Sequence, residues 1–360
     1  MTATIISAAA SPYGRRKEVE EFENTKLGVK GLVDSGITRV PAFFHHPPDP
    51  LPESDQDEDP IPVIDLSGPE SEVVDRVRDA AAKFGFFQVV NHGVPVSLLD
   101  RLVNAVRGFH ELPEAEKKVH YRRDVSTGAS FFSNVDLFVS KAASWRDTLQ
   151  IRLGPTMANL AAIPSICRDE VIEWDKEVKQ LGERLLALLC QGLGLHADKL
   201  KEMSCSEGRV MVGHYYPYCP EPEKTVGIAC HTDPGLLTVL LQDQVGGLQV
   251  KLDGKWVNVK SVHGALVINI GDLLQIISND QYTSVEHRVV ANSHREPRVS
   301  VAVFFNPSKR DNLYGPLPEL VSPEKPAVYR QFTYSDYITR FFHRELDRKS
   351  MPNYYKLQNE

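Results

Sequence analysis

The chain has 360 residues and a net charge of −7, with 42% hydrophobic and 25% charged side chains. This size and composition suit one large or two smaller globular domains with a sizeable core. The acidic balance argues against a nucleic-acid partner. No stretch reaches the roughly 18–20 continuous apolar residues of a membrane span. Five cysteines without a CxxC pair favour a reducing compartment over a disulfide framework. We therefore expect a cytoplasmic protein without a membrane partner, and a monomer by default.

The first sixty residues carry little apolar surface. Residues 1–20 are polar and are expected to be frayed. The run 47–60 is rich in proline and acidic residues, so it cannot form a helix and indicates a linker or an exposed loop. We assign residues 1–60 to an N-terminal extension that ends in an acidic, proline-rich linker.

Residues 61–205 have the pattern of a mixed helical region. Apolar residues at helical spacing predict one helix from Ser71 that stops at Gly85 and another that starts at Pro95. A long helix is predicted over residues 168–193, because its apolar residues follow one stripe at spacings of three and four. This stripe is expected to cover the β-core that follows.

Short β-prone runs separated by turns begin near Arg209. Asp253-Gly254 is a hairpin signal between two of these runs. The pattern predicts a mainly β protein with flanking helices (α+β). Its core would be a double-stranded β-helix, or jelly roll, over residues 206–310, supported by the long helix. Residues 311–360 are expected to form a C-terminal helical segment near the mouth of a pocket.

Two histidines and one aspartate are candidate metal ligands. His231 and Asp233 are two residues apart in a β-prone setting, and residues i and i+2 of a strand share one face. His287 is far enough along the chain to return on a neighbouring strand. Two histidines and one carboxylate form the facial triad of non-haem Fe(II) sites, which leaves open coordination positions. Open positions indicate catalysis, although a His-x-Asp pair alone also arises by chance.

Arg298 and Ser300 strengthen this hypothesis. On a strand they share one face, where a guanidinium and a hydroxyl offer charge-assisted donors to a carboxylate. The hydroxyl of Tyr216 could add a further bond. Iron together with a buried carboxylate anchor favours a co-substrate that bridges both, as a 2-oxo diacid does.

Taken together, these motifs resemble plant 2-oxoglutarate/Fe(II)-dependent dioxygenases. The resemblance is carried by His231-Thr-Asp233, His287, Arg298-Val-Ser300, the sequence Tyr-Tyr-Pro-Tyr-Cys-Pro over 215–220 and the sequence GFFQVVNHG over 85–93. The segment 22–36 resembles the branch of 1-aminocyclopropane-1-carboxylate oxidase homologues, which includes benzoxazinoid and alkaloid hydroxylases. One departure is His214, which stands where the family often has asparagine. We interpret it as a packing residue near the site rather than a ligand, and its role stays open.

The resemblance implies a catalytic Fe(II) site, a 2-oxoglutarate site and a substrate wall. The catalytic metal ligands would be His231, Asp233 and His287, and the 2-oxoglutarate ligands Tyr216, Arg298 and Ser300. Phe132 and Asn134 lie in the aromatic region 121–154, which serves either as pocket wall or as plain core. They are candidate substrate contacts, with Phe304, which could stack on an aromatic substrate.

The implied reaction is oxidation, foremost hydroxylation, of a small specialised metabolite with O2 and 2-oxoglutarate. It would release succinate and CO2, with ascorbate as reductant. Desaturation and demethylation are other outcomes of the same chemistry. Two alternatives stay open at this point: an ascorbate-driven oxidase of 1-aminocyclopropane-1-carboxylate, which shares these residues, and a non-catalytic jelly-roll binding protein. A requirement for 2-oxoglutarate separates the first alternative from the leading hypothesis.

Overall fold

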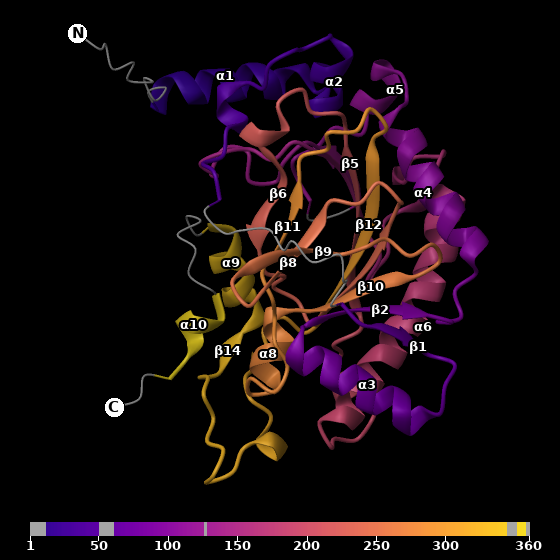
Figure 1. The fold of residues 1–360 in the computed structure, drawn as a ribbon, viewed down its shortest axis with the longest axis vertical. Helices are drawn as coiled ribbons and strands as arrows, with labels where there is room; N and C mark the ends of the chain where they lie inside the picture. The colour runs from indigo at the N-terminus through magenta and orange to yellow at the C-terminus, as the bar shows by residue number, and fades with distance from the viewer. Residues whose placement is uncertain (1–11, 50–60, 126–127, 344–350, 358–360) are drawn as a thin grey trace.

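The computed structural model describes residues 12–49, 61–125, 128–343 and 351–357, and its centre is an eight-stranded sheet (Figure 1). The strands follow the order β1 (Val63–Asp65), β2 (Phe86–Val90), β10 (Leu266–Ile270), β7 (Leu237–Gln242), β12 (Arg298–Asn306), β5 (Gly208–Tyr216), β4 (Asp147–Arg152) and β3 (Ala129–Phe132). The first pair is parallel, and the other neighbours pair antiparallel.

A four-stranded sheet packs against the inner face of the larger one. Its order is β6 (Val226–His231), β11 (His287–Val290), β8 (Leu248–Leu252) and β9 (Lys255–Asn258). One apolar cluster joins Phe86 and Val267 of the larger sheet to Val250 and Val289 of the smaller one. Two facing sheets of this kind confirm the predicted jelly-roll core. A short ribbon, β13 (Leu313–Tyr314) with β14 (Phe332–Thr333), follows the core.

Three helices cover the outer face of the eight-stranded sheet: α3 (Glu70–Lys83), α4 (Val96–His110) and α6 (Arg168–Gly192) (Figure 1). Because strand residues alternate between faces, the odd-numbered residues of β7 and β12 point outward, and they join the helices in the main core. The predicted long helix is confirmed as α6. It approaches β12 so closely that a Cβ on Gly182 would lie 2.2 Å from the ring of Phe305.

The N-terminal extension is helical where the structure describes it. The helices α1 (Pro12–Thr25) and α2 (Gly28–Asp34) lie across one end of the sheets (Figure 1). The expectation that residues 1–20 are frayed is therefore wrong for residues 12–20. Phe22 packs against Phe43 and Phe44 of a 3₁₀ turn, η1 (Ala42–Phe44). The helix α1 has too few apolar residues to show a helical period, and Phe22 finds its packing partners in a later segment of the chain. Residues 50–60 of the predicted linker lie outside the described residues.

The remaining helices are short. They are α5 (Glu114–Lys118), α7 (Lys199–Glu202), α8 (Asp272–Ile277), α9 (Tyr334–His343) and α10 (Met351–Tyr355), with the 3₁₀ turns η2 (Leu160–Ala162), η3 (Pro222–Lys224) and η4 (Pro318–Leu320). Among the described helices, none is long and apolar enough to cross a membrane. The segment 61–205 contributes β1 to β4 to the same sheet as β5, and the domain bounds at residues 60, 205 and 310 stay predictions.

Candidate active site

Strand register gathers polar side chains on the inner face of the eight-stranded sheet. Arg298 of β12 pairs with Tyr216 of β5, and Ser300 pairs with both His214 of β5 and Gln242 of β7. Residues directly opposite each other point to the same face. The same face carries Phe304 further along β12. The larger sheet therefore presents one polar row at one end of its inner face and an aromatic ring further along.

The three predicted metal ligands converge between the sheets. His231, the last residue of β6, lies opposite His287, the first residue of β11, with ring centres 4.2 Å apart. The Oδ1 of Asp233 lies 3.6 Å from the Nε2 of His231 and 3.8 Å from the Nε2 of His287. All three ligand atoms lie within 4.8 Å of one another. Asp233 lies two residues beyond His231, after the end of β6, in a segment without regular secondary structure.

Backbone carbonyls orient both imidazole rings. The Nδ1 of His231 lies 2.8 Å from the oxygen of Ala229, and the Nδ1 of His287 lies 3.1 Å from the oxygen of Val285. These bonds place the proton on Nδ1 and leave the Nε2 lone pairs facing Asp233. Burial, helped by the nearby His287, lowers the pKa of His231 to about 4, so this imidazole is neutral at physiological pH. Neutral imidazole is the form that binds a metal.

The carboxylate of Asp233 is held by two residues that sequence patterns did not single out. Its Oδ2 accepts hydrogen bonds from the Oγ1 of Thr238 at 2.5 Å and from the Nδ2 of Asn269 at 2.7 Å. These bonds leave Oδ1 directed at the two imidazoles. The only sequence signal was strand parity, which places both donors on the inner face. Two neutral nitrogens and one oriented carboxylate oxygen fit the facial-triad donor set of Fe(II).

A buried guanidinium lies at the polar end of the inner face. Arg298 is 2% exposed. Its Nη1 donates to the Oγ of Ser300 at 3.1 Å and its Nη2 to the Oε1 of Gln242 at 3.0 Å. The guanidinium also lies 4.8 Å from the ring centre of Tyr216. Gln242 had no sequence motif to reveal it.

Arg298 forms no salt bridge with a described residue, and its Nε is buried without a hydrogen-bond partner among them. Asp243 acts on it only from beyond salt-bridge distance: burial raises the pKa of that carboxyl, and the charge of Arg298 opposes the rise. A buried cation is costly unless an anion pairs with it. The arrangement therefore fits the distal carboxylate of a 2-oxo diacid.

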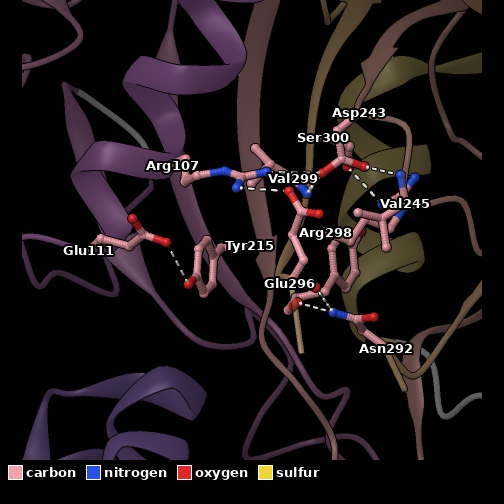
Figure 2. Close-up of polar contacts among 11 residues, drawn as sticks. Arg107, Glu111, Tyr215, Asp243, Val245, Asn292, Glu296, Arg298, Val299 and Ser300 are labelled. Carbon is pink, nitrogen blue, oxygen red and sulfur yellow. Dashed lines mark hydrogen bonds and ion pairs between the residues drawn. The ribbon is translucent and has the colours of Figure 1, made fainter. Parts of the chain in front are cut away.

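Asp243 fixes the start of β12, where Arg298 is carried (Figure 2). Its carboxylate accepts hydrogen bonds from the backbone nitrogens of Val299 at 2.5 Å and Val245 at 3.0 Å. Arg107 of α4 lies 3.9 Å from the same carboxylate and 3.2 Å from Glu296. These contacts tie the anchor strand to the helical layer behind the sheet.

His214 lies between the carboxylate anchor and β4. Its Nδ1 is 3.1 Å from the Oγ1 of Thr148. Burial, together with the positive charges of Arg146 and Arg298, holds its pKa well below the ordinary value, so the ring is neutral. His214 is thus a buried polar residue of the inner face, set apart from the triad by its place on β5.

The three candidate substrate contacts have different surroundings. Phe304 is half-buried on the inner face of β12, and Phe132 of β3 pairs with Thr148 of β4. Asn134 is completely buried, and its side chain binds the hydroxyl of Ser133 and both backbone groups of Ser144. Its amide therefore ties the loop after β3 together.

Comparison with known proteins agrees with this geometry. Residues 207–307 match the 2OG-Fe(II) oxygenase superfamily, and residues 61–162 match the family described as non-haem dioxygenase in morphine synthesis N-terminal. The chain is 46% identical to 1-aminocyclopropane-1-carboxylate oxidase homolog 3 of Arabidopsis thaliana, over 96% of this chain and 98% of that protein. It is 42% identical to deacetoxyvindoline 4-hydroxylase of Catharanthus roseus, over 98% and 92%.

A solved structure shows the same fold. The crystal structure of JOX2 in complex with 2OG, Fe, and JA superposes with a TM-score of 0.82 at 34% identity, covering 92% of this chain and 98% of that one. The chain belongs to the 2OG-Fe(II) oxygenase superfamily. It is a dioxygenase that uses Fe(II), 2-oxoglutarate and O2, with ascorbate as the usual reductant of the family, to oxidise a small molecule. The prediction of a non-catalytic binding protein is thereby set aside.

Proposed function

We propose that His231, Asp233 and His287 hold the catalytic Fe(II), and that Arg298, Ser300 and Tyr216 bind the distal carboxylate of 2-oxoglutarate. The observation that carries this assignment is the convergence of the three ligand atoms within 4.8 Å. The second part is supported by the buried guanidinium of Arg298, which forms no salt bridge with a described residue. Fe(II) supplies the redox chemistry that activates O2 while 2-oxoglutarate is converted to succinate and CO2.

The residues of the chain have separate tasks in this proposal. The bonds from His231 and His287 to backbone carbonyls fix the ring orientation before the metal binds. Thr238 and Asn269 hold the Oδ2 of Asp233, so that only its Oδ1 would bind the metal. Arg298 orients the co-substrate, whose charge is shielded from water by the two sheets.

We propose hydroxylation of a small specialised metabolite as the reaction, with desaturation or demethylation as the other outcomes. A named hydroxylase among the relatives supports this choice. Phe304 and Phe132 would form the substrate wall. The amide of Asn134 is already hydrogen-bonded to Ser133 and Ser144, so its contact with the substrate stays a prediction without structural support. Five cysteines without a disulfide agree with a cytoplasmic protein. A monomer without nucleic-acid or membrane partners remains our expectation.

Succinate release from 2-oxoglutarate, with Fe(II) and ascorbate, tests the assignment across plant phenolics, alkaloids and benzoxazinoid glucosides. The wild type should form succinate faster when a substrate is present, and Asp233→Ala should form none and bind no Fe(II). The exposed Asp169→Ala is the matched control and should behave as the wild type. Wild-type succinate production by Asp233→Ala would contradict the ligand set. Turnover of 1-aminocyclopropane-1-carboxylate without 2-oxoglutarate would favour the ascorbate-driven oxidase instead.

A further inference from the structure

A second arginine beside the site, Arg146, forms no salt bridge with a described residue. Arg146 immediately precedes β4, whose first residue, Asp147, pairs with Tyr215, so Arg146 comes level with Tyr216 of the proposed co-substrate site. Thr148, two residues further on, contacts His214 on the inner face. Burial lowers the pKa of His214, and the positive charge of Arg146 adds to the lowering. The charge of Arg146 therefore acts on His214, which pairs with Ser300 of the proposed co-substrate site.

Arg146 is half-buried, and two nitrogens of its guanidinium are buried without acceptors among the described residues. Nε and Nη1 of Arg146 both lack a hydrogen-bond partner among the described residues, and Arg146 forms no salt bridge with any of them. Asp136 acts on it only at longer range. The buried Arg209, in contrast, binds both oxygens of Asp175, at 2.9 and 3.2 Å.

An unpaired buried guanidinium costs free energy in the folded protein. Its planar fork of donors matches a carboxylate better than any neutral group. Arg298 likewise forms no salt bridge with a described residue and has a buried Nε without a partner among them, and there it fits the acid of the co-substrate. We propose that Arg146 is a second carboxylate anchor of the active site, which binds an acid group of either the prime substrate or 2-oxoglutarate. This inference rests on the proposed function of the site.

Anaerobic titration calorimetry separates the two sources of the acid without relying on turnover. The Fe(II)-loaded wild type, Arg146→Met and Arg146→Lys are first titrated with 2-oxoglutarate. If the acid belongs to the co-substrate, Arg146→Met should raise the Kd about 10- to 100-fold, with Arg146→Lys in between. Arg152→Met is the matched control and should keep the wild-type Kd. Arg152 lies at the other end of β4 and also has a buried Nε without a partner among the described residues.

The second arm uses protein loaded with Fe(II) and 2-oxoglutarate. It is titrated with phenylacetate, 4-hydroxycinnamate and octanoate, each paired with its uncharged primary amide. If the acid belongs to the prime substrate, the wild type should bind at least one acid about tenfold more tightly than its amide. Arg146→Met should lose this preference and Arg152→Met should keep it.

Thermal unfolding distinguishes a ligand-binding role of Arg146 from a structural role. Removal of an unpaired buried charge should leave the melting temperature of Arg146→Met unchanged or higher, whereas a structural arginine would lower it. The inference is overturned if Arg146→Met binds 2-oxoglutarate as the wild type does and no acid is preferred over its amide. An equal loss in Arg152→Met would also overturn it. A wild type that binds neither Fe(II) nor 2-oxoglutarate would instead overturn the proposed function.

Discussion

Asn269 of β10 donates a hydrogen bond of 2.7 Å to the Oδ2 of Asp233. Thr238, which pairs with Asn269 across β7 and β10, donates to the same oxygen at 2.5 Å. The adjacent strands β7 and β10 thus hold the carboxylate of Asp233, which lies beyond the end of β6. The proposed metal site therefore depends on the register of the larger sheet as well as on its three ligands.

Asn269→Ala is expected to lower the affinity for Fe(II) about 10- to 100-fold, because an outer hydrogen bond to a metal ligand is lost while the ligand stays. Titration of the apo-protein with Fe(II) under nitrogen measures the change. Thr238→Val, which keeps the shape and removes the other donor, should weaken binding in the same direction. An unchanged affinity for Fe(II) in both variants would show that the backbone segment after β6 orients Asp233 without these two hydrogen bonds.

Arg298→Lys should raise the Kd for 2-oxoglutarate about 10- to 100-fold without changing the affinity for Fe(II). Lysine keeps the charge but cannot reproduce the planar fork that reaches both Ser300 and Gln242. Calorimetry with each ligand separately gives both constants. Arg101→Lys, in an exposed salt bridge with Glu173, is the matched control. A lysine variant with wild-type affinity for 2-oxoglutarate would place the anchor elsewhere.

The N-terminal extension is attached to the sheet through Asp147 of β4. Its carboxylate accepts the backbone N–H groups of Val29 at 2.7 Å and Lys30 at 2.8 Å, which begin α2. Asp147→Asn loses one of these acceptors. We expect faster hydrogen exchange across residues 12–45, measured by mass spectrometry, with the exchange of β12 unchanged. If residues 12–45 exchange as slowly in the variant as in the wild type, the apolar contacts of Phe22 are enough to hold the N-terminal extension on the sheet.

The same variant should show a defined pH dependence. Burial raises the pKa of Asp147 to about 6 from the ordinary 3.8, against the opposing N–H bonds. The folded protein then binds more protons than the unfolded chain in this window, so the stability from protonated Asp147 is full below pH 3.8 and is lost as pH rises through about 6. The disadvantage of Asp147→Asn should therefore shrink between pH 4 and pH 7, by at most about 3 kcal/mol. Urea unfolding measures it, and a disadvantage that grows with pH would contradict the raised pKa.

The motif residues were predictable because their chemistry is local in sequence. Arg298 and Ser300 lie on one strand at a spacing that puts them on the same face, and the structure brings them together. His231 and Asp233 also come together, although Asp233 lies beyond the end of β6. The long helix α6 was predictable for the same reason, since its stripe has one period throughout.

Asn269, Gln242 and Arg146 were not predictable. Each acts across strands, and register between distant strands follows from the folded sheet rather than from a pattern in one segment. The N-terminal helices were not predicted because they lack a periodic apolar stripe. Phe22 is buried in a cluster with Trp145, which is distant in sequence.

Gly182 of α6 tests how closely the helix must approach β12. A Cβ there would lie 2.2 and 2.3 Å from two ring atoms of Phe305, which is fully buried and cannot swing into solvent. Alanine favours the helix by about 1 kcal/mol, but overpacking costs about 1–3 kcal/mol, so Gly182→Ala should be destabilising on balance. Urea unfolding should show this loss, and Phe305→Leu in the same chain should recover part of it. The exposed Gln180→Ala, two residues earlier in α6, gives the helix-propensity control. A Gly182→Ala variant more stable than the wild type would mean that α6 can move away from the strand that carries Arg298.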